Sequence, residues 1–298
     1  MKQVKFITGL MAFGVVSLFA GCGEKENEMT KVTLNEVAHS IFYAPQYVAL
    51  ENGYFTQEGI DLDLVTGYGA DKTMAAVISG EAQIGFMGAE ASVYAYLEGA
   101  NDPVINFAQG TQRAGNFLVA REEMADFQWS DLKGKEVLGG RKGGMPEMVF
   151  EYILKENGLD PAKDLSIDQS IDFGSTAAAF SGGKGEFTVE FEPAATTLEK
   201  NGDGFVVASL GVDSGYVPYT SYSAKTSYVE KHPEIIQAFT DGLQKGVDYV
   251  NSHTAEEIAK LIQPQFKEND LDTITRIVER YQSQDTWKEN LVFEKESS

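Results

Sequence analysis

The sequence predicts an α/β fold with two lobes, each built around a largely parallel sheet. Three observations support this prediction. Strand-like and helical segments alternate from residue 31 to residue 208, short glycine-marked turns join them, and only helical segments follow Pro233. Alternation of this kind is typical of sheets whose two faces are covered by helices. Because no strand is expected after residue 233, the last helices must pack on a sheet that earlier residues form.

The first run of segments is expected to build one lobe. Apolar residues at every second position of residues 31–38 predict a strand. The helix that follows is expected to end at Gly53, since glycine commonly follows the last turn of a helix. The predicted strands are 31–38, 60–65, 82–87, 104–108 and 117–120, and the predicted helices are 45–52, 70–79 and 89–97.

A second unit is expected to begin near Trp129. Its predicted strands are 136–139, 166–171, 187–191 and 205–208, and its predicted helices are 146–156, 176–180 and 193–200. A tyrosine-rich link without periodicity covers residues 215–222, and the final helices are predicted at 233–251, 255–262 and 271–282. We therefore expect a discontinuous first lobe of residues 31–120 plus 217–298 and a second lobe of residues 121–216.

Composition excludes several classes of function. The 298 residues carry 45 Asp and Glu against 24 Lys and Arg, a net charge of −21. A general nucleic-acid binder needs clustered basic residues, so we expect no nucleic-acid partner. The single cysteine excludes a disulfide scaffold and a cysteine-based metal site. The three histidines lie far apart, and the P-loop, nucleophile-elbow and dinucleotide motifs are absent from the sequence, so we predict no metal, no cofactor and no enzymatic activity.

The N-terminus has the features of a secretion signal. Lys2 and Lys5 precede an apolar run over residues 6–20, which has the length of a signal-peptide core. The small residues before Cys22 resemble a bacterial lipoprotein signal, in which the cysteine thiol takes a diacylglyceryl group, although Phe19 replaces the usual leucine. We expect residues 1–21 to be the signal peptide, Cys22 the lipidation site and residues 22–30 a tether. An ordinary secretory signal with an incidental cysteine is the alternative.

Several motifs along the body occur in a recognisable order. FYAPQYVA lies at 42–49, ISGEAQIGF at 78–86, FEP at 191–193 and KHPE at 231–234. The ordered set, which runs from Val32 to Val250, resembles the solute-binding proteins of ABC importers. The nearest group is the nitrate, alkanesulfonate and thiamine-precursor binding family, which also contains the fungal thiamine-pyrimidine synthases. Residues 216–222 lack the cysteines that those synthases carry near the matching region.

The resemblance implies a fold, partners and a location. The fold would be the two-lobe, type II periplasmic-binding-protein fold, with the ligand cleft between the lobes. The partners would be a small-molecule solute, an ABC permease and its ATPase, with the binding protein itself a monomer. Together with the N-terminal signal, the resemblance implies that the protein lies at the extracytoplasmic face of a bacterial cell membrane, held there by its lipid anchor alone. A sensor built on the same fold is the alternative class.

Candidate ligand-binding residues lie where strands end and helices begin, because ligands in such sheets face strand C-termini and helix N-termini. Backbone N–H groups at helix starts can bind a ligand oxygen. Alternatively, His39 would be a core histidine, Glu90 a partner of the helix dipole and Tyr219 part of the hinge. The candidates are His39, Tyr43, Gly67, Tyr68, Gly88, Ala89, Glu90, Gln109, Arg141, Gly143, Gly144, Glu190 and Tyr219.

The chemistry of these candidates favours one ligand class. Aromatic rings such as Tyr43 stack on planar ligands, and carboxylates such as Glu90 accept hydrogen bonds from ring or amino N–H groups. A sulfonate or nitrate site would not need acidic side chains. We therefore predict a small heteroaromatic solute similar to a thiamine-pyrimidine precursor, with an alkanesulfonate or nitrate as the alternative.

Overall fold

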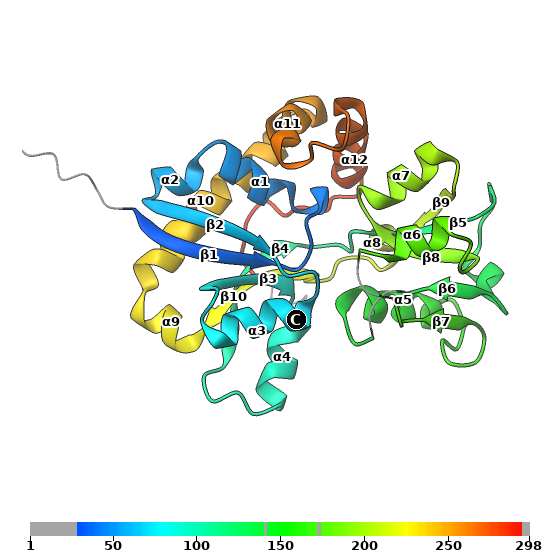
Figure 1. Ribbon diagram of the computed structural model, residues 1–298, viewed down its shortest axis with the longest axis horizontal. Helices are drawn as coiled ribbons and strands as arrows, with labels where there is room; N and C mark the ends of the chain where they lie inside the picture. The colour runs from blue at the N-terminus through cyan, green and yellow to red at the C-terminus, as the bar shows by residue number, and fades with distance from the viewer. Residues whose placement is uncertain (1–28, 140–141, 172–173, 294–298) are drawn as a thin grey trace, which may run out of the picture.

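The computed structural model describes residues 29–139, 142–171 and 174–293, and its body has two lobes, each with one five-stranded sheet (Figure 1). The first sheet has the order β2 (Ile60–Thr66), β1 (Thr30–Glu36), β3 (Ile84–Gly88), β10 (Thr220–Lys225) and β4 (Val104–Thr111). The second has the order β7 (Ser166–Asp168), β6 (Glu136–Leu138), β8 (Phe187–Phe191), β5 (Asn116–Ala120) and β9 (Phe205–Ser209). The predicted α/β class is confirmed.

Strand β10 is the main element that the sequence analysis missed. It lies between β3 and β4 and runs antiparallel to both, so the first sheet is mixed and not largely parallel as expected. Five of its six residues are buried. A strand covered on both faces shows no alternation of apolar and polar residues, which is why residues 215–222 appear in the sequence as a link.

Strand β5 corrects the expected domain boundary. All five of its residues are buried, and it pairs antiparallel with β8 on one side and β9 on the other. The expectation that residues 31–120 belong wholly to the first lobe is therefore wrong for this strand. The chain enters the second sheet between Thr111 and Asn116 and returns to the first between Ser209 and Thr220. Periodicity reveals a strand but not the sheet that it joins.

The helices cover both sheets. Those around the first sheet are α1 (Ala44–Glu51), α2 (Tyr54–Gln57), α3 (Ala70–Ser79), α4 (Glu90–Leu97), α9 (Thr226–Lys231), α10 (Pro233–Ser252), α11 (Ala255–Ile262) and α12 (Leu271–Ser283). Those of the second lobe are α5 (Met145–Glu156), α6 (Thr176–Ser181), α7 (Ala194–Asn201) and α8 (Leu210–Asp213). As expected, α10 packs on the first lobe, against α1 and α2. Gly246 allows this approach, because a Cβ there would collide with the carbonyl oxygen of Pro45.

Helix α12 also holds the two lobes together. The Tyr281 hydroxyl donates a hydrogen bond to the carbonyl of Gly115 at 2.9 Å. Arg280 forms ion pairs with Glu192 at 2.5 Å and with Glu199 at 3.1 Å, both in the second lobe. Glu192 is fully buried, so Arg280 supplies the cation that its carboxylate needs. Within the described ranges, none of the helices is both long enough and apolar enough to cross a bilayer.

Candidate functional site

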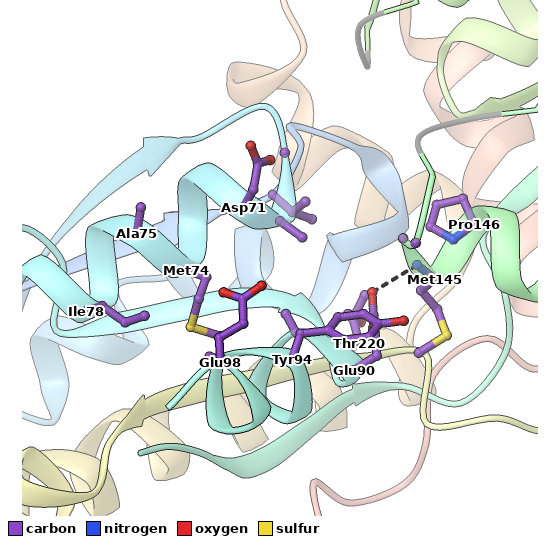
Figure 2. A pocket seen from close by; sticks show the side chains of 18 of the residues that line it. Asp71, Met74, Ala75, Ile78, Glu90, Tyr94, Glu98, Met145, Pro146 and Thr220 are labelled. Carbon is purple, nitrogen blue, oxygen red and sulfur yellow. Dashed lines mark hydrogen bonds between the residues drawn. The ribbon is translucent and has the colours of Figure 1, made fainter. Parts of the chain in front are cut away.

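A cavity of about 800 Å³ opens between the lobes and continues between α3 and α4 (Figure 2). Its walls come from the ends of β1 and β3, from the facing sides of α3 and α4, and from the loop and first residues of α5 in the second lobe. The charged or aromatic side chains on its walls are Tyr43, Asp71, Glu90, Tyr94, Glu98, Lys142, Phe191 and Tyr219. The site is thus shared by both lobes, and carboxylates outnumber cations among its described residues.

Glu90 lies at the centre of this site. Strand β3 ends at Gly88 and α4 begins at Glu90, and a side chain at residue 88 would overlap the Glu90 carboxylate. Glu90 Oε1 accepts a hydrogen bond from the backbone N–H of Met145 across the cleft at 2.9 Å (Figure 2). Glu90 Oε2 is buried and has no hydrogen-bond partner among the described residues. Burial raises the pKa of Glu90 to about 7, so this carboxyl group changes between its neutral and ionised forms near neutral pH.

Aromatic rings form the inner end of the cavity. Tyr43 is 2% exposed and packs edge-on against Phe86, with ring centroids 4.5 Å apart. The Tyr219 hydroxyl donates a hydrogen bond to Asn116 Oδ1, which fixes that ring beside the cleft. Burial raises the pKa of both phenols above their usual range, so both remain neutral.

A smaller cavity of about 130 Å³ adjoins the first and shares Pro146 and Phe191 with it. His39, Tyr68 and Glu190 line it. Glu190 accepts a hydrogen bond from the Thr188 hydroxyl at 2.6 Å, and burial raises the pKa of Glu190 to about 7. This carboxyl group is therefore another buried acid at the edge of the site.

The structure brings most of the predicted site residues to these two cavities. Those on the main cavity are Tyr43, Gly88, Glu90, Gly143, Gly144 and Tyr219. Those on the smaller one are His39, Tyr68 and Glu190. Gly67, Ala89 and Gln109 line neither cavity. Arg141 and Cys22 lie outside the described residues.

Local packing explains the residues that lie elsewhere. Gly67 sits against Asn35 and Thr73, where a side chain would collide, so its role is in packing. Gln109 is 1% exposed within β4, and its amide nitrogen donates to the carbonyl of Thr111.

His39 has the character of a core histidine even though it borders the smaller cavity. Its Nδ1 lies 2.8 Å from Glu36 Oε1 and its Nε2 lies 2.9 Å from the carbonyl oxygen of Gln265. Its ring also stacks on Phe266. Both ring nitrogens are thus engaged within the protein.

The part of the cavity between α3 and α4 was not predicted from the sequence. Asp71, Met74, Ala75 and Ile78 line it from α3, and Ala91, Tyr94, Ala95 and Glu98 line it from α4 and its C-terminal end. These positions recur every three or four residues, which was the available signal. The same spacing is typical of a helix face turned towards the core, so sequence alone could not distinguish the two.

No group of acidic, histidine or cysteine side chains in the described part of the chain has the arrangement of a metal site. The residues that line the cavity offer hydrogen-bond acceptors, aromatic side chains and apolar surface, which are the means of binding an organic solute.

Two α/β lobes with a ligand-sized cavity between them define the class of periplasmic-binding-protein folds. The chain belongs to the family described as NMT1/THI5 like, whose model matches residues 41–257. YtlA, a candidate binding protein of Bacillus subtilis (strain 168), is 47% identical over 278 residues, which cover 93% of this chain and 83% of that protein.

Solved structures support the fold assignment. The alkanesulfonate-binding protein SsuA from Xanthomonas axonopodis pv. citri, bound to MOPS, has a TM-score of 0.71 at 15% identity, over 85% of this chain and 84% of that one. The periplasmic nitrate-binding protein NrtA from Synechocystis PCC 6803 has a TM-score of 0.70 at 16% identity, over 84% of this chain and 70% of that one. A Candida albicans protein described as having the generic periplasmic binding protein fold has a TM-score of 0.59 at 14% identity, over 91% of this chain and 100% of that one. The predicted two-lobe fold is confirmed.

Proposed function

We propose that this protein is the extracytoplasmic solute receptor of an ABC importer and that it captures a small heteroaromatic solute similar to a thiamine-pyrimidine precursor. Family membership and the shared fold support the receptor role. Closure of the two lobes around the solute would present a closed complex to a permease and its ATPase. The role is binding and delivery, not catalysis.

The charge of the cavity is the observation that carries the choice of ligand. Asp71, Glu90 and Glu98 line it, and Lys142 is the one cation among its described lining residues. Glu90 Oε2 is buried and without a partner, so an N–H donor on the solute would satisfy it. Among the aromatic rings that line the cavity, Tyr94 is 44% exposed and offers surface for a planar ring, whereas Tyr43 is 2% exposed.

The same region argues against an alkanesulfonate or nitrate, the ligands in the names of two structural neighbours. The N-terminus of α5 would be the natural place for an anion. The N–H of Met145, the first residue of α5, already donates to Glu90, and the N–H of Gly143 in the preceding loop donates to Glu147. An anion would have to displace these groups and tolerate their charge.

The lipid anchor at Cys22 and the extracytoplasmic location form part of the same proposal. The sequence of residues 1–22 supports them, with the lysines, the apolar run and the single cysteine of the chain in the order of a lipoprotein signal. An anchored receptor would remain close to its permease. Genes for a permease and an ATPase beside this one would separate the importer from a sensor on the same fold.

The test is a calorimetric titration of Glu90→Gln with an aminopyrimidine. Above pH 7, where Glu90 is ionised, losing a charge-assisted hydrogen bond should weaken binding by about tenfold to a hundredfold, because such a bond contributes about 1.5–3 kcal/mol. Glu81→Gln is the matched control, since Glu81 is exposed and lies outside the cavity. Equal affinity in the wild type and Glu90→Gln would refute the role of Glu90 in binding.

A further inference from the structure

We propose that the solute has an apolar arm, attached to its heteroaromatic head, that lies in the groove between α3 and α4. The inference rests on the proposed function and deepens it, since it concerns the shape of the ligand in the same cavity. The groove is defined here by Met74, Ala75 and Ile78 of α3 and by Ala91, Tyr94 and Ala95 of α4.

The groove is continuous with the site around Glu90. Both helices begin at the cleft and pack side by side, so their facing sides form one wall of a single cavity (Figure 2). From Glu90 to Glu98 the wall extends for eight residues, or about 12 Å at the rise of an α-helix. A head bound at Glu90 would therefore leave a long channel unfilled unless the solute itself extended into it.

The groove is apolar and partly open. Ile78 is 45% exposed and Tyr94 is 44% exposed, whereas Met74 is 7% exposed at the base. Exposed apolar side chains gathered along a groove commonly mark a ligand or partner surface. The continuity with the buried Glu90 carboxyl group favours a solute arm over a separate protein partner.

The cavity has room for such an arm. A cavity of about 800 Å³ lies in the range of sites for drug-sized ligands, about 300–1,000 Å³, and is far larger than a single small ring or a nitrate needs. The carboxylate of Glu98 borders the far end of the groove, where a polar or cationic terminus of the arm would meet it. The solute class is thus an elongated heteroaromatic amine with one apolar arm.

The experiment titrates an aminopyrimidine and its ethyl, butyl and hexyl derivatives by calorimetry. A fully buried methylene strengthens binding by about fourfold, and we expect about twofold per methylene in a groove that is open on one side. The hexyl derivative should therefore bind on the order of tens of fold more tightly than the unsubstituted ring. In Ala75→Trp, which fills the groove from an exposed position of α3, that gain should shrink to at most a few fold.

Val93→Trp is the matched control, because Val93 is 54% exposed on α4 and does not line the cavity. It should retain the full gain of the hexyl derivative. Equal affinities across the series in the wild type would overturn the arm and leave the proposed function standing. A hexyl gain that survives Ala75→Trp would also overturn it, because the arm would then bind elsewhere. Absence of binding by every member, the unsubstituted ring included, would overturn both proposals.

Discussion

The buried carboxyl group of Glu90 predicts a measurable change of stability with pH. Burial raises the pKa of Glu90 from its ordinary value of 4.5 to about 7. The folded protein therefore holds this proton more tightly than the unfolded chain does. Between about pH 4.5 and pH 7 the folded state binds more protons, so the free energy of unfolding falls as the pH rises. Below that pH window, Glu90 is protonated in both states and does not change the free energy of unfolding with pH. Above the window, Glu90 is ionised in both states, and its buried charge lowers the free energy of unfolding by the full amount.

The magnitude follows from the pKa difference. One pKa unit corresponds to about 1.4 kcal/mol, so ionised Glu90 costs the empty protein about 3 kcal/mol at high pH. Glu90→Gln removes this cost, and the glutamine oxygen can still accept the hydrogen bond from the Met145 N–H. The variant should be more stable than the wild type by up to about 3 kcal/mol near pH 8 and of similar stability near pH 4.5.

Urea unfolding of both proteins at several pH values between these limits measures the difference. Glu190, whose pKa is also raised to about 7 by burial, remains in both proteins, so the pH dependence of the variant is reduced and not abolished. Parallel stability curves for the two proteins would refute the reasoning. A variant that is more stable yet binds an aminopyrimidine less tightly would show that Glu90 is kept for function at the expense of stability.

Three further predictions concern the body and the anchor. Arg280→Leu should lower the free energy of unfolding by about 3–5 kcal/mol, because it leaves the buried Glu192 carboxylate without its cation. Lys260→Ala, which breaks the exposed pair with Glu256, should lower it by less than about 1 kcal/mol. Chemical denaturation of both variants measures the two free energies. A fragment of residues 114–216 should unfold cooperatively, whereas one of residues 121–216 should not, because the shorter fragment lacks β5 from the interior of the second sheet. Circular dichroism during thermal unfolding distinguishes the two fragments. Cooperative unfolding of the shorter fragment would contradict the assignment of β5 to the second lobe. Cys22→Ala should release the protein into the medium of a bacterial host, as seen by immunoblotting of cell and medium fractions, and a variant that stays membrane-bound and matures normally would contradict lipidation at Cys22.

Local signals predicted much of the fold. The bounds of α3, β8 and α11 agree with the sequence analysis residue for residue, since each has clear periodicity or a clear terminal residue such as Gly80. The missed strand β10 is buried on both faces and has no alternation. The assignment of β5 to the wrong lobe has a different cause, because strand pairing depends on contacts far apart in the sequence.

Some features of the candidate site could likewise be predicted from local sequence signals, and others could not. Tyr43, Gly88 and Glu90 could be predicted because they follow strands, where cleft residues of this kind of fold occur. The hydrogen bond between Glu90 and Met145 could not, since it joins residues 55 positions apart on different lobes. The groove between α3 and α4 was hidden for a third reason, because its stripe of small and apolar residues is also typical of a core face.

The most direct test of the ligand proposal is a set of calorimetric titrations of the wild-type protein with an aminopyrimidine, ethanesulfonate and nitrate under one set of conditions. The acidic and aromatic lining of the cavity predicts measurable binding of the aminopyrimidine and none of the two anions. Tighter binding of ethanesulfonate or nitrate than of the aminopyrimidine would contradict the account.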